Sequence, residues 1–146
     1  MNTLERVWLM IKLLKENYDN ALSIQQRMLM GPHPRQLSNE EKQVSQIEAK
    51  KVVCEVGITM YQFNKYLKSR YKKTAENEAI HLAVKQGEEL GLLKLGNPRR
   101  YDADKGLQGQ NIVLTEEGFI KIFDQGFYFV INATHAMYAA NPRRKY

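Results

Sequence analysis

Two short stretches decide the expected fold of this chain: Glu88-Glu89-Leu90-Gly91-Leu92-Leu93 and Val113-Leu114-Thr115-Glu116-Glu117-Gly118. The first joins an amphipathic helix to a leucine-rich strand through Gly91, and glycine is the usual residue just past a helix end. The second joins a strand to a helix through Thr115, a residue type that caps helix N-termini. The strands, 92–95 and 110–114, are therefore expected to pair as a β-hairpin around the basic loop between them.

Helical spacing and capping signals predict four helices before this hairpin. The first runs from Leu4 to about Met30, and Gly31-Pro32 ends it because proline cannot continue a helix. Capping boxes, in which Ser or Thr is followed three residues later by Glu or Gln, begin the next two helices. The expected caps are Ser38 with Glu41, Thr59 with Gln62, and Thr74 for the fourth helix.

Each of these helices has an expected apolar face. The second runs through Val44, Ile47, Val52, Val53 and Val56 to Gly57; the third turns Phe63, Tyr66 and Leu67 inward; the fourth turns Ile80, Val84, Gly87 and Leu90 inward. After the hairpin, a last helix is expected from Thr115 through Phe119 to Met137, followed by a basic tail.

The order helix, helix, strand, loop, strand, helix from Thr59 onward resembles the winged helix-turn-helix superfamily. In that superfamily, segments like the two quoted above bracket the β-hairpin wing. The long terminal helices resemble those of the MarR group. The chain also resembles PadR-type regulators. The resemblance implies a mainly α protein with a small β-hairpin, a winged helix-turn-helix flanked by long N- and C-terminal helices. One domain, 1–146, is expected, with N-terminal helices (1–57), a winged helix-turn-helix (58–122) and a C-terminal helix with a basic tail (116–146).

The charge of the chain favours a polyanionic partner. Its formal net charge is +6 and its pI about 9.4, as in many proteins that bind nucleic acids. The resemblance implies that the helix after Thr74 enters the major groove of double-stranded DNA, with its outward residues at the bases. The expected DNA contacts are Asn77, Glu78, His81 and Lys85 on this helix, Lys72, Lys73 and Thr74 before it, and Arg99, Arg100 and Lys105 in the loop. The alternative is an ordinary solvated helix face beside a polar loop.

The narrow apolar stripe of the first helix has two interpretations. It is typical of a helix that packs in the core of one subunit, and also of a dimer seam. The resemblance to the MarR group, whose terminal helices form the dimer, favours a homodimer. The expected dimer residues are Leu4, Val7, Ile11, Leu14, Tyr18, Phe127 and Val130.

Catalysis, cofactors and metal ions are not expected. Cys54 is the only cysteine, and the three histidines (His33, His81, His135) have no partner at metal-ligand spacing. No glycine-rich phosphate loop or nucleophile elbow occurs. The N-terminus lacks a signal-peptide pattern and no apolar run is long enough to cross a bilayer, so a cytoplasmic protein without a membrane partner is expected.

The sequence therefore predicts sequence-specific DNA binding by a dimeric winged-helix transcriptional regulator. A plasmid or viral replication or partition protein is an alternative with the same fold, and a non-catalytic protein-interaction scaffold is another. The MarR resemblance also implies a small-molecule effector near aromatic residues such as Trp8, Tyr18 or Phe127, which nothing else in the sequence supports.

Overall fold

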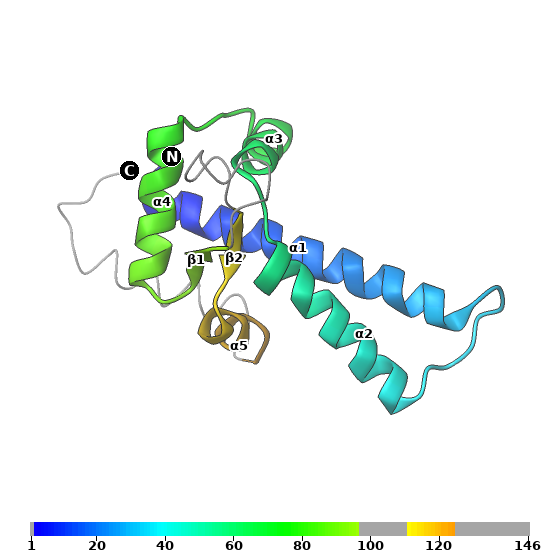
Figure 1. Cartoon of the computed structure of the whole chain (residues 1–146). Helices are drawn as coiled ribbons and strands as arrows, with labels where there is room; N and C mark the ends of the chain where they lie inside the picture. Colours follow the sequence, from blue (N-terminus) through cyan, green and yellow to red (C-terminus); the bar gives the residue numbers. More distant parts are fainter. Residues whose placement is uncertain (1, 97–110, 125–146) are drawn as a thin grey trace.

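The computed structural model describes residues 2–96 and 111–124, which are mainly helical with one small antiparallel sheet (Figure 1). The elements are α1 (Thr3–Met30), α2 (Asn39–Lys51), a π-helical turn η1 (Val52–Val56), α3 (Met60–Tyr71), α4 (Asn77–Glu89), β1 (Leu93–Leu95), β2 (Ile112–Leu114) and α5 (Glu116–Asp124). The predicted mainly helical class with a small antiparallel strand pair is confirmed.

Most helix ends follow the capping signals. Ser38 with Glu41 and Thr59 with Gln62 form capping boxes, and Thr115 accepts a hydrogen bond from the Gly118 N–H at the start of α5. The predicted cap at Thr74 is wrong, because α4 begins at Asn77 with Glu76 as its N-cap. The Ala75 N–H donates to the Asn64 side-chain oxygen at 2.8 Å. This hydrogen bond keeps Ala75 in the turn between α3 and α4, before the first residue of α4.

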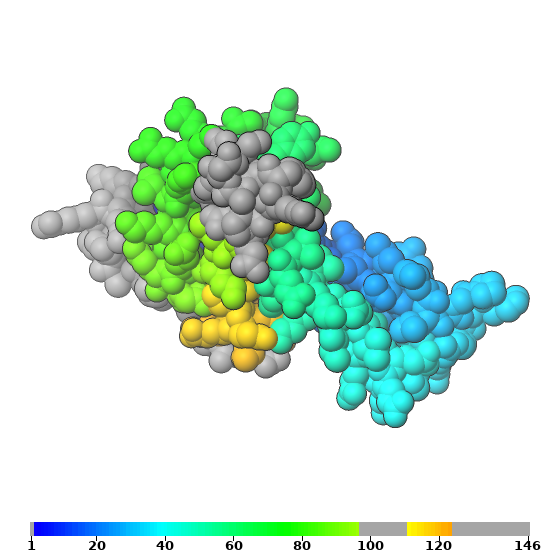
Figure 2. Space-filling model, in the orientation of Figure 1, coloured from blue at the N-terminus to red at the C-terminus, as the bar shows by residue number. Residues whose placement is uncertain are grey.

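The far end of α1 and the start of α2 form a helical arm that projects from the rest of the molecule (Figures 1 and 2). The apolar face predicted for α2 is partly wrong: Val44, Ile47 and Val56 are more than half exposed. The buried positions of α2 are the small residues Ser45 and Ala49. Small side chains allow α2 to approach α1 closely. The buried Ser45 hydroxyl donates a hydrogen bond to the Lys42 carbonyl, so this donor is satisfied although it is buried.

The two strands pair in the register Leu93 with Leu114, Lys94 with Val113, and Leu95 with Ile112. Ile58 forms an isolated antiparallel bridge on the other side of Ile112, with hydrogen bonds of 2.9 and 2.8 Å. Gly57 makes this approach possible: its φ is 70°, and a Cβ there would overlap the Ile112 carbonyl. The sheet is therefore joined to the segment that precedes α3, which the sequence analysis did not anticipate.

The core lies where α1, α3, α4 and the sheet meet. Its fully buried side chains include Val7, Met10, Ile11, Leu14, Ile58, Phe63, Ile80, Leu93, Ile112, Leu114 and Ile122. Five of the seven residues predicted for a dimer seam are buried within this single chain: Leu4, Val7, Ile11, Leu14 and Tyr18. The core-helix alternative therefore accounts for them, because side chains enclosed by their own chain cannot also pack against a second copy.

The other predicted residues Arg99, Arg100, Lys105, Phe127 and Val130 lie outside the described residues. Within the described ones, no helix combines the length and the apolar character needed to cross a membrane.

Candidate nucleic-acid interface

One face of α4 is buried and the opposite face is exposed, as the sequence predicted. Ile80, Val84 and Gly87 lie in the core, and Ala83 joins them. A Cβ on Gly87 would lie 2.5 Å from the Leu93 Cδ1, so the glycine lets β1 pack closely against α4. The exposed face carries Asn77, Glu78, His81 and Lys85, together with Leu82, which the sequence analysis did not select. The helix therefore presents amide, imidazole, carboxylate, ammonium and methyl groups side by side.

The turn before α4 has an unusual backbone at Lys72. Its φ and ψ are 56° and 32°, the left-handed conformation that glycine usually occupies at a helix end. Its N–H donates to the Leu67 carbonyl and closes α3. The side chains of Lys72, Lys73 and Thr74 are exposed.

Helix α1 contacts the C-terminal end of α3, directly before this turn. Arg70 contacts Glu16 through two 3.3 Å hydrogen bonds and lies over the Tyr66 ring. Lys12 donates to the Tyr71 hydroxyl at 3.3 Å. Burial, and then the Glu16 carboxylate, raise the pKa of Tyr66, so its phenol stays protonated. Arg70 is therefore held by α1, whereas Lys72, Lys73 and Lys85 form no ion pair with any described residue.

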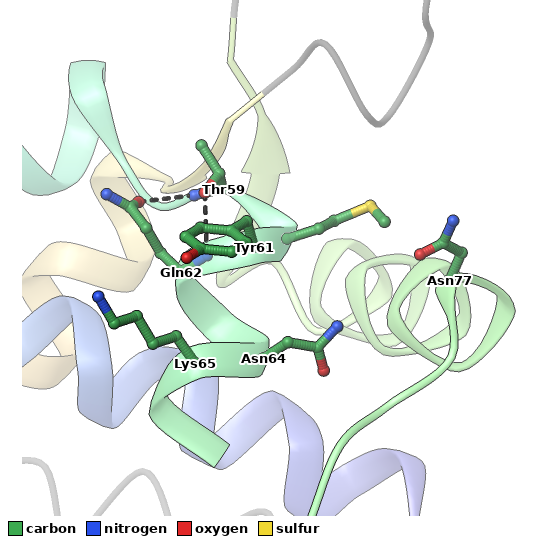
Figure 3. A pocket seen from close by; sticks show the side chains of 7 residues that line it. Thr59, Tyr61, Gln62, Asn64, Lys65 and Asn77 are labelled. Atoms are coloured by element: carbon green, nitrogen blue, oxygen red, sulfur yellow. Dashed lines mark hydrogen bonds between the residues drawn. The ribbon is translucent and has the colours of Figure 1, made fainter. Parts of the chain in front are cut away.

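A polar cavity of about 680 Å³ opens between α3 and the start of α4 (Figure 3). Its lining residues are Thr59, Met60, Tyr61, Gln62, Asn64, Lys65 and Asn77. Tyr61 is 73% exposed, more than any other large hydrophobic side chain of the described residues. Of this lining, Asn77 alone was predicted from the sequence as a contact residue. The capping box at Thr59 and the i, i+4 spacing of Tyr61 and Lys65 were the signals that could have identified the rest.

The predicted contact residues do not all face the same side. Asn77 lines the α3–α4 cavity, whereas Lys73 lines another cavity of about 410 Å³ with Glu5, Trp8, Leu9 and Tyr71. The basic turn and the start of α4 therefore border two different cavities. Arg99, Arg100 and Lys105 belong to residues 97–110, outside the described structure, although the ends of that loop are fixed by the β1–β2 pairing.

Other kinds of site have little support in the described residues. They contain no group of three His, Cys, Asp or Glu side chains that could hold a metal ion. Burial raises the pKa of the half-buried Cys54 thiol, which disfavours the nucleophilic thiolate.

Comparisons of the chain with family models, with curated proteins and with solved structures gave no match.

Proposed function

We propose that this protein is a winged-helix protein that binds double-stranded DNA sequence-specifically as a homodimer and regulates transcription in the cytoplasm, without catalysis. The observation that carries the proposal is the exposed polar face of α4, backed by a buried apolar face and preceded by lysines that form no ion pair with any other residue that the structure describes. The order α3, α4, β1, β2, α5 supports the winged-helix assignment, as does the bridge of Ile58 to β2.

The exposed groups of α4 suit base edges in the major groove, which is about 12 Å wide and admits a helix. Asn77 has the amide geometry for adenine, and the His81 imidazole can donate to guanine. Lys85 suits guanine or a phosphate, and Glu78 can accept from the cytosine amino group. Leu82, half exposed beside them, suits the methyl group of thymine.

Phosphate contacts are assigned to the groups around α4. Lys72, Lys73 and Thr74 precede the helix, where backbone N–H groups also favour an anion. Lys65 and Tyr61, at the rim of the α3–α4 cavity, extend this surface. Arg99, Arg100 and Lys105 of the loop are proposed to reach the backbone or the minor groove, whose negative potential attracts arginine.

The dimer contact is assigned to the projecting arm. Ile24 and Met28 are four residues apart on α1 and are 54% and 70% exposed. Large apolar side chains at this spacing form one helical stripe, the arrangement by which two helices pack.

A salt titration on random duplex DNA tests the proposal. Affinity should fall with salt, and Lys72→Ala with Lys73→Ala should reduce the slope of log K against log salt by up to about 0.9 per lysine. The matched control is Lys42→Ala with Lys51→Ala, which removes the same charge from α2 and should leave the slope unchanged. Negligible binding at low salt would reject DNA binding.

A protein-interaction scaffold is the second candidate. The observation that favours it is the set of exposed large apolar side chains on α2 and η1, namely Val44, Ile47 and Val56. A scaffold would show no salt-dependent binding to duplex DNA, so the same titration separates the two functions.

A further inference from the structure

The cavity between α3 and α4 has a lining that suits a flat, polar ligand (Figure 3). Its volume of about 680 Å³ lies within the range of small-molecule sites, about 300–1,000 Å³. Among the described residues that line it, Lys65 alone is charged, and the others include the Tyr61 ring, the Met60 thioether and several side-chain amides. One cation among neutral donors, acceptors and apolar groups matches a nucleobase with its phosphate better than it matches a cluster of phosphates.

Tyr61 supplies an aromatic face at the rim of this cavity. It is the second residue of α3, its side chain is 73% exposed, and its ring contacts no other aromatic ring in the part of the chain that the structure describes. Every base has a π face, so an exposed ring accepts bases by stacking whatever their sequence. Lys65 follows four residues later on the same side of α3, where it suits the phosphate of a nucleotide stacked on Tyr61.

Asn64 of α3 and Asn77 of α4 line the cavity from two different helices. The Asn64 side-chain oxygen accepts the Ala75 N–H, which fixes the orientation of the amide, and its nitrogen turns toward Asn77 (Figure 3). Neither this nitrogen nor the Asn77 amide forms a hydrogen bond with another described residue. The two amides therefore offer free donors and an acceptor, the groups that bind the edge of a base.

The position of the cavity connects it to the surface proposed to bind DNA. Asn77 is the first residue of α4, so it belongs both to the cavity lining and to the helix face assigned to base edges. A base that rotates out of the duplex beside this end of α4 would meet the cavity first. Rotation out of the stack is unfavourable by a few kcal/mol, and least so for a base that is already mispaired.

We propose that the α3–α4 cavity binds one nucleobase rotated out of the DNA duplex. The face of the base lies on Tyr61, its edge meets Asn64 and Asn77, and its phosphate lies near Lys65. DNA that contains a mispaired base is then the preferred ligand. The inference rests on the proposed DNA binding and adds an unstacked base to a contact otherwise made with paired ones.

Two duplexes of the same sequence, one fully paired and one with a central mismatch, test the inference with the full-length protein. The wild type should bind the mismatched duplex about 10-fold more tightly, because its base costs less to rotate out. Tyr61→Phe should keep this preference. Tyr61→Leu, which keeps an apolar side chain but has no aromatic face, should lose it.

The outcomes separate this inference from the proposed function. Equal affinity of the wild type for the two duplexes, with binding that still weakens as salt rises, would overturn the inference and leave DNA binding standing. A Tyr61→Leu protein that retains the preference would also overturn it. Negligible binding of both duplexes would reject DNA binding, and the inference with it.

A photocrosslink identifies the occupant of the cavity. 5-Iodouracil at the mispaired position should couple to the peptide that contains Tyr61 when the complex is irradiated, and this product should be absent with Tyr61→Leu. Coupling to a peptide of α4 that contains His81 would place the base inside the duplex. Saturable binding of adenosine monophosphate without DNA, together with no mismatch preference, would show a free nucleotide as the occupant. Either of these two results overturns the inference.

Discussion

Lys72 combines two properties that rarely coincide in one residue. Its backbone is left-handed, which is unfavourable by roughly 1 kcal/mol for a residue with a side chain, yet it is a lysine rather than a glycine. Backbone strain of this kind is often retained where a side chain is needed for function. In the proposed function, the needed group is an ammonium beside the recognition helix.

Lys72→Gly should therefore stabilise the protein and weaken DNA binding together. We expect the free energy of unfolding to rise by roughly 0.5–1 kcal/mol, measured by urea denaturation, because glycine adopts this conformation without strain but is more flexible when unfolded. The salt slope on random duplex should fall by about 0.9. Lys72→Arg is the control that keeps the charge and the strain. A Lys72→Gly protein that is less stable than the wild type would contradict the role of the turn.

The polar residues of α4 should determine sequence preference rather than overall affinity. Asn77→Ala and His81→Ala should each reduce the difference between a selected site and random DNA by about 1–3 kcal/mol, because each removes hydrogen bonds to base edges. Gel-shift titrations with the two DNAs measure this difference. Gln86→Ala, on the half-buried flank of the same helix, is the control. Equal losses on both DNAs would show that the two residues do not contact bases.

At the scale of elements, short backbone contacts hold α4, β1 and α5 together. The Thr115 hydroxyl donates to the Gly91 carbonyl at 2.6 Å, and the Thr115 N–H donates to the Leu92 carbonyl at 3.0 Å. Gly118 then lies directly on Leu92. These contacts join the end of α4, the strand β1 and the start of α5.

Gly118→Ala should destabilise this unit strongly. The new Cβ would lie 2.5 Å from the Leu92 carbonyl oxygen and 3.0 Å from its Cα, and backbone atoms cannot move aside cheaply. A loss of at least about 1–3 kcal/mol in the free energy of unfolding is expected from overpacking. Gly87→Ala should destabilise the protein as well, because its Cβ would lie 2.5–2.9 Å from the Cδ1, Cγ and Cβ atoms of the buried Leu93 side chain. A Gly118→Ala protein that is as stable as the wild type in thermal unfolding would contradict the packing described here.

The loop that joins α1 to α2 contains a pH-dependent contact. Arg35 binds the Glu41 carboxylate with two hydrogen bonds of 2.9 and 2.6 Å, and also the Leu29 carbonyl. The hydrogen bonds from Arg35, and then that from the Ser38 N–H, lower the pKa of Glu41 from 4.5 to about 2.

Because the carboxylate is favoured in the folded state, this contact contributes to stability above pH 4.5, and the contribution is lost as the pH falls from 4.5 towards 2. Arg35→Gln should move the NMR titration midpoint of Glu41 back towards 4.5. A midpoint that does not change would show that the arginine does not hold the carboxylate in solution.

At the scale of the whole molecule, the projecting α1–α2 arm is the feature that a single chain does not explain. Its end carries exposed apolar residues on α1, whereas the other half of the same helix is enclosed by the core. A homodimer joined through the arm would hold two α4 helices at a fixed separation, as a site with two half-sites requires.

Ile24→Lys with Met28→Lys should convert the dimer to a folded monomer in sedimentation equilibrium, because four like charges would meet in the contact. Gln43→Lys with Gln46→Lys adds the same charge to exposed positions of α2, outside the Ile24–Met28 stripe and without removing apolar surface, and should remain dimeric. A monomeric wild-type protein would reject the dimer, and a dimeric Ile24→Lys, Met28→Lys protein would place its contact elsewhere.

Local signals in the sequence determined much of the fold. Capping boxes at Ser38 and Thr59, glycines at the helix ends and the two segments around Leu92 and Leu114 predicted the helices and the strand pair, because such signals act within a few residues. The division of α4 into a buried and an exposed face followed from the helical period alone. Helical propensity and capping are short-range properties, so one sequence was sufficient for them.

The tertiary structure alone decided which apolar residues are enclosed. The apolar spacing of α1 from Leu4 to Tyr18 is the same in a core helix as in a dimer seam. In the structure this stripe packs against the rest of its own chain, as a core helix does. Exposure of Ile47 and burial of Ser45 likewise depend on how closely α1 approaches α2, which no local pattern records. Burial is a property of contacts between residues far apart in the chain, and periodicity describes only which residues share a face.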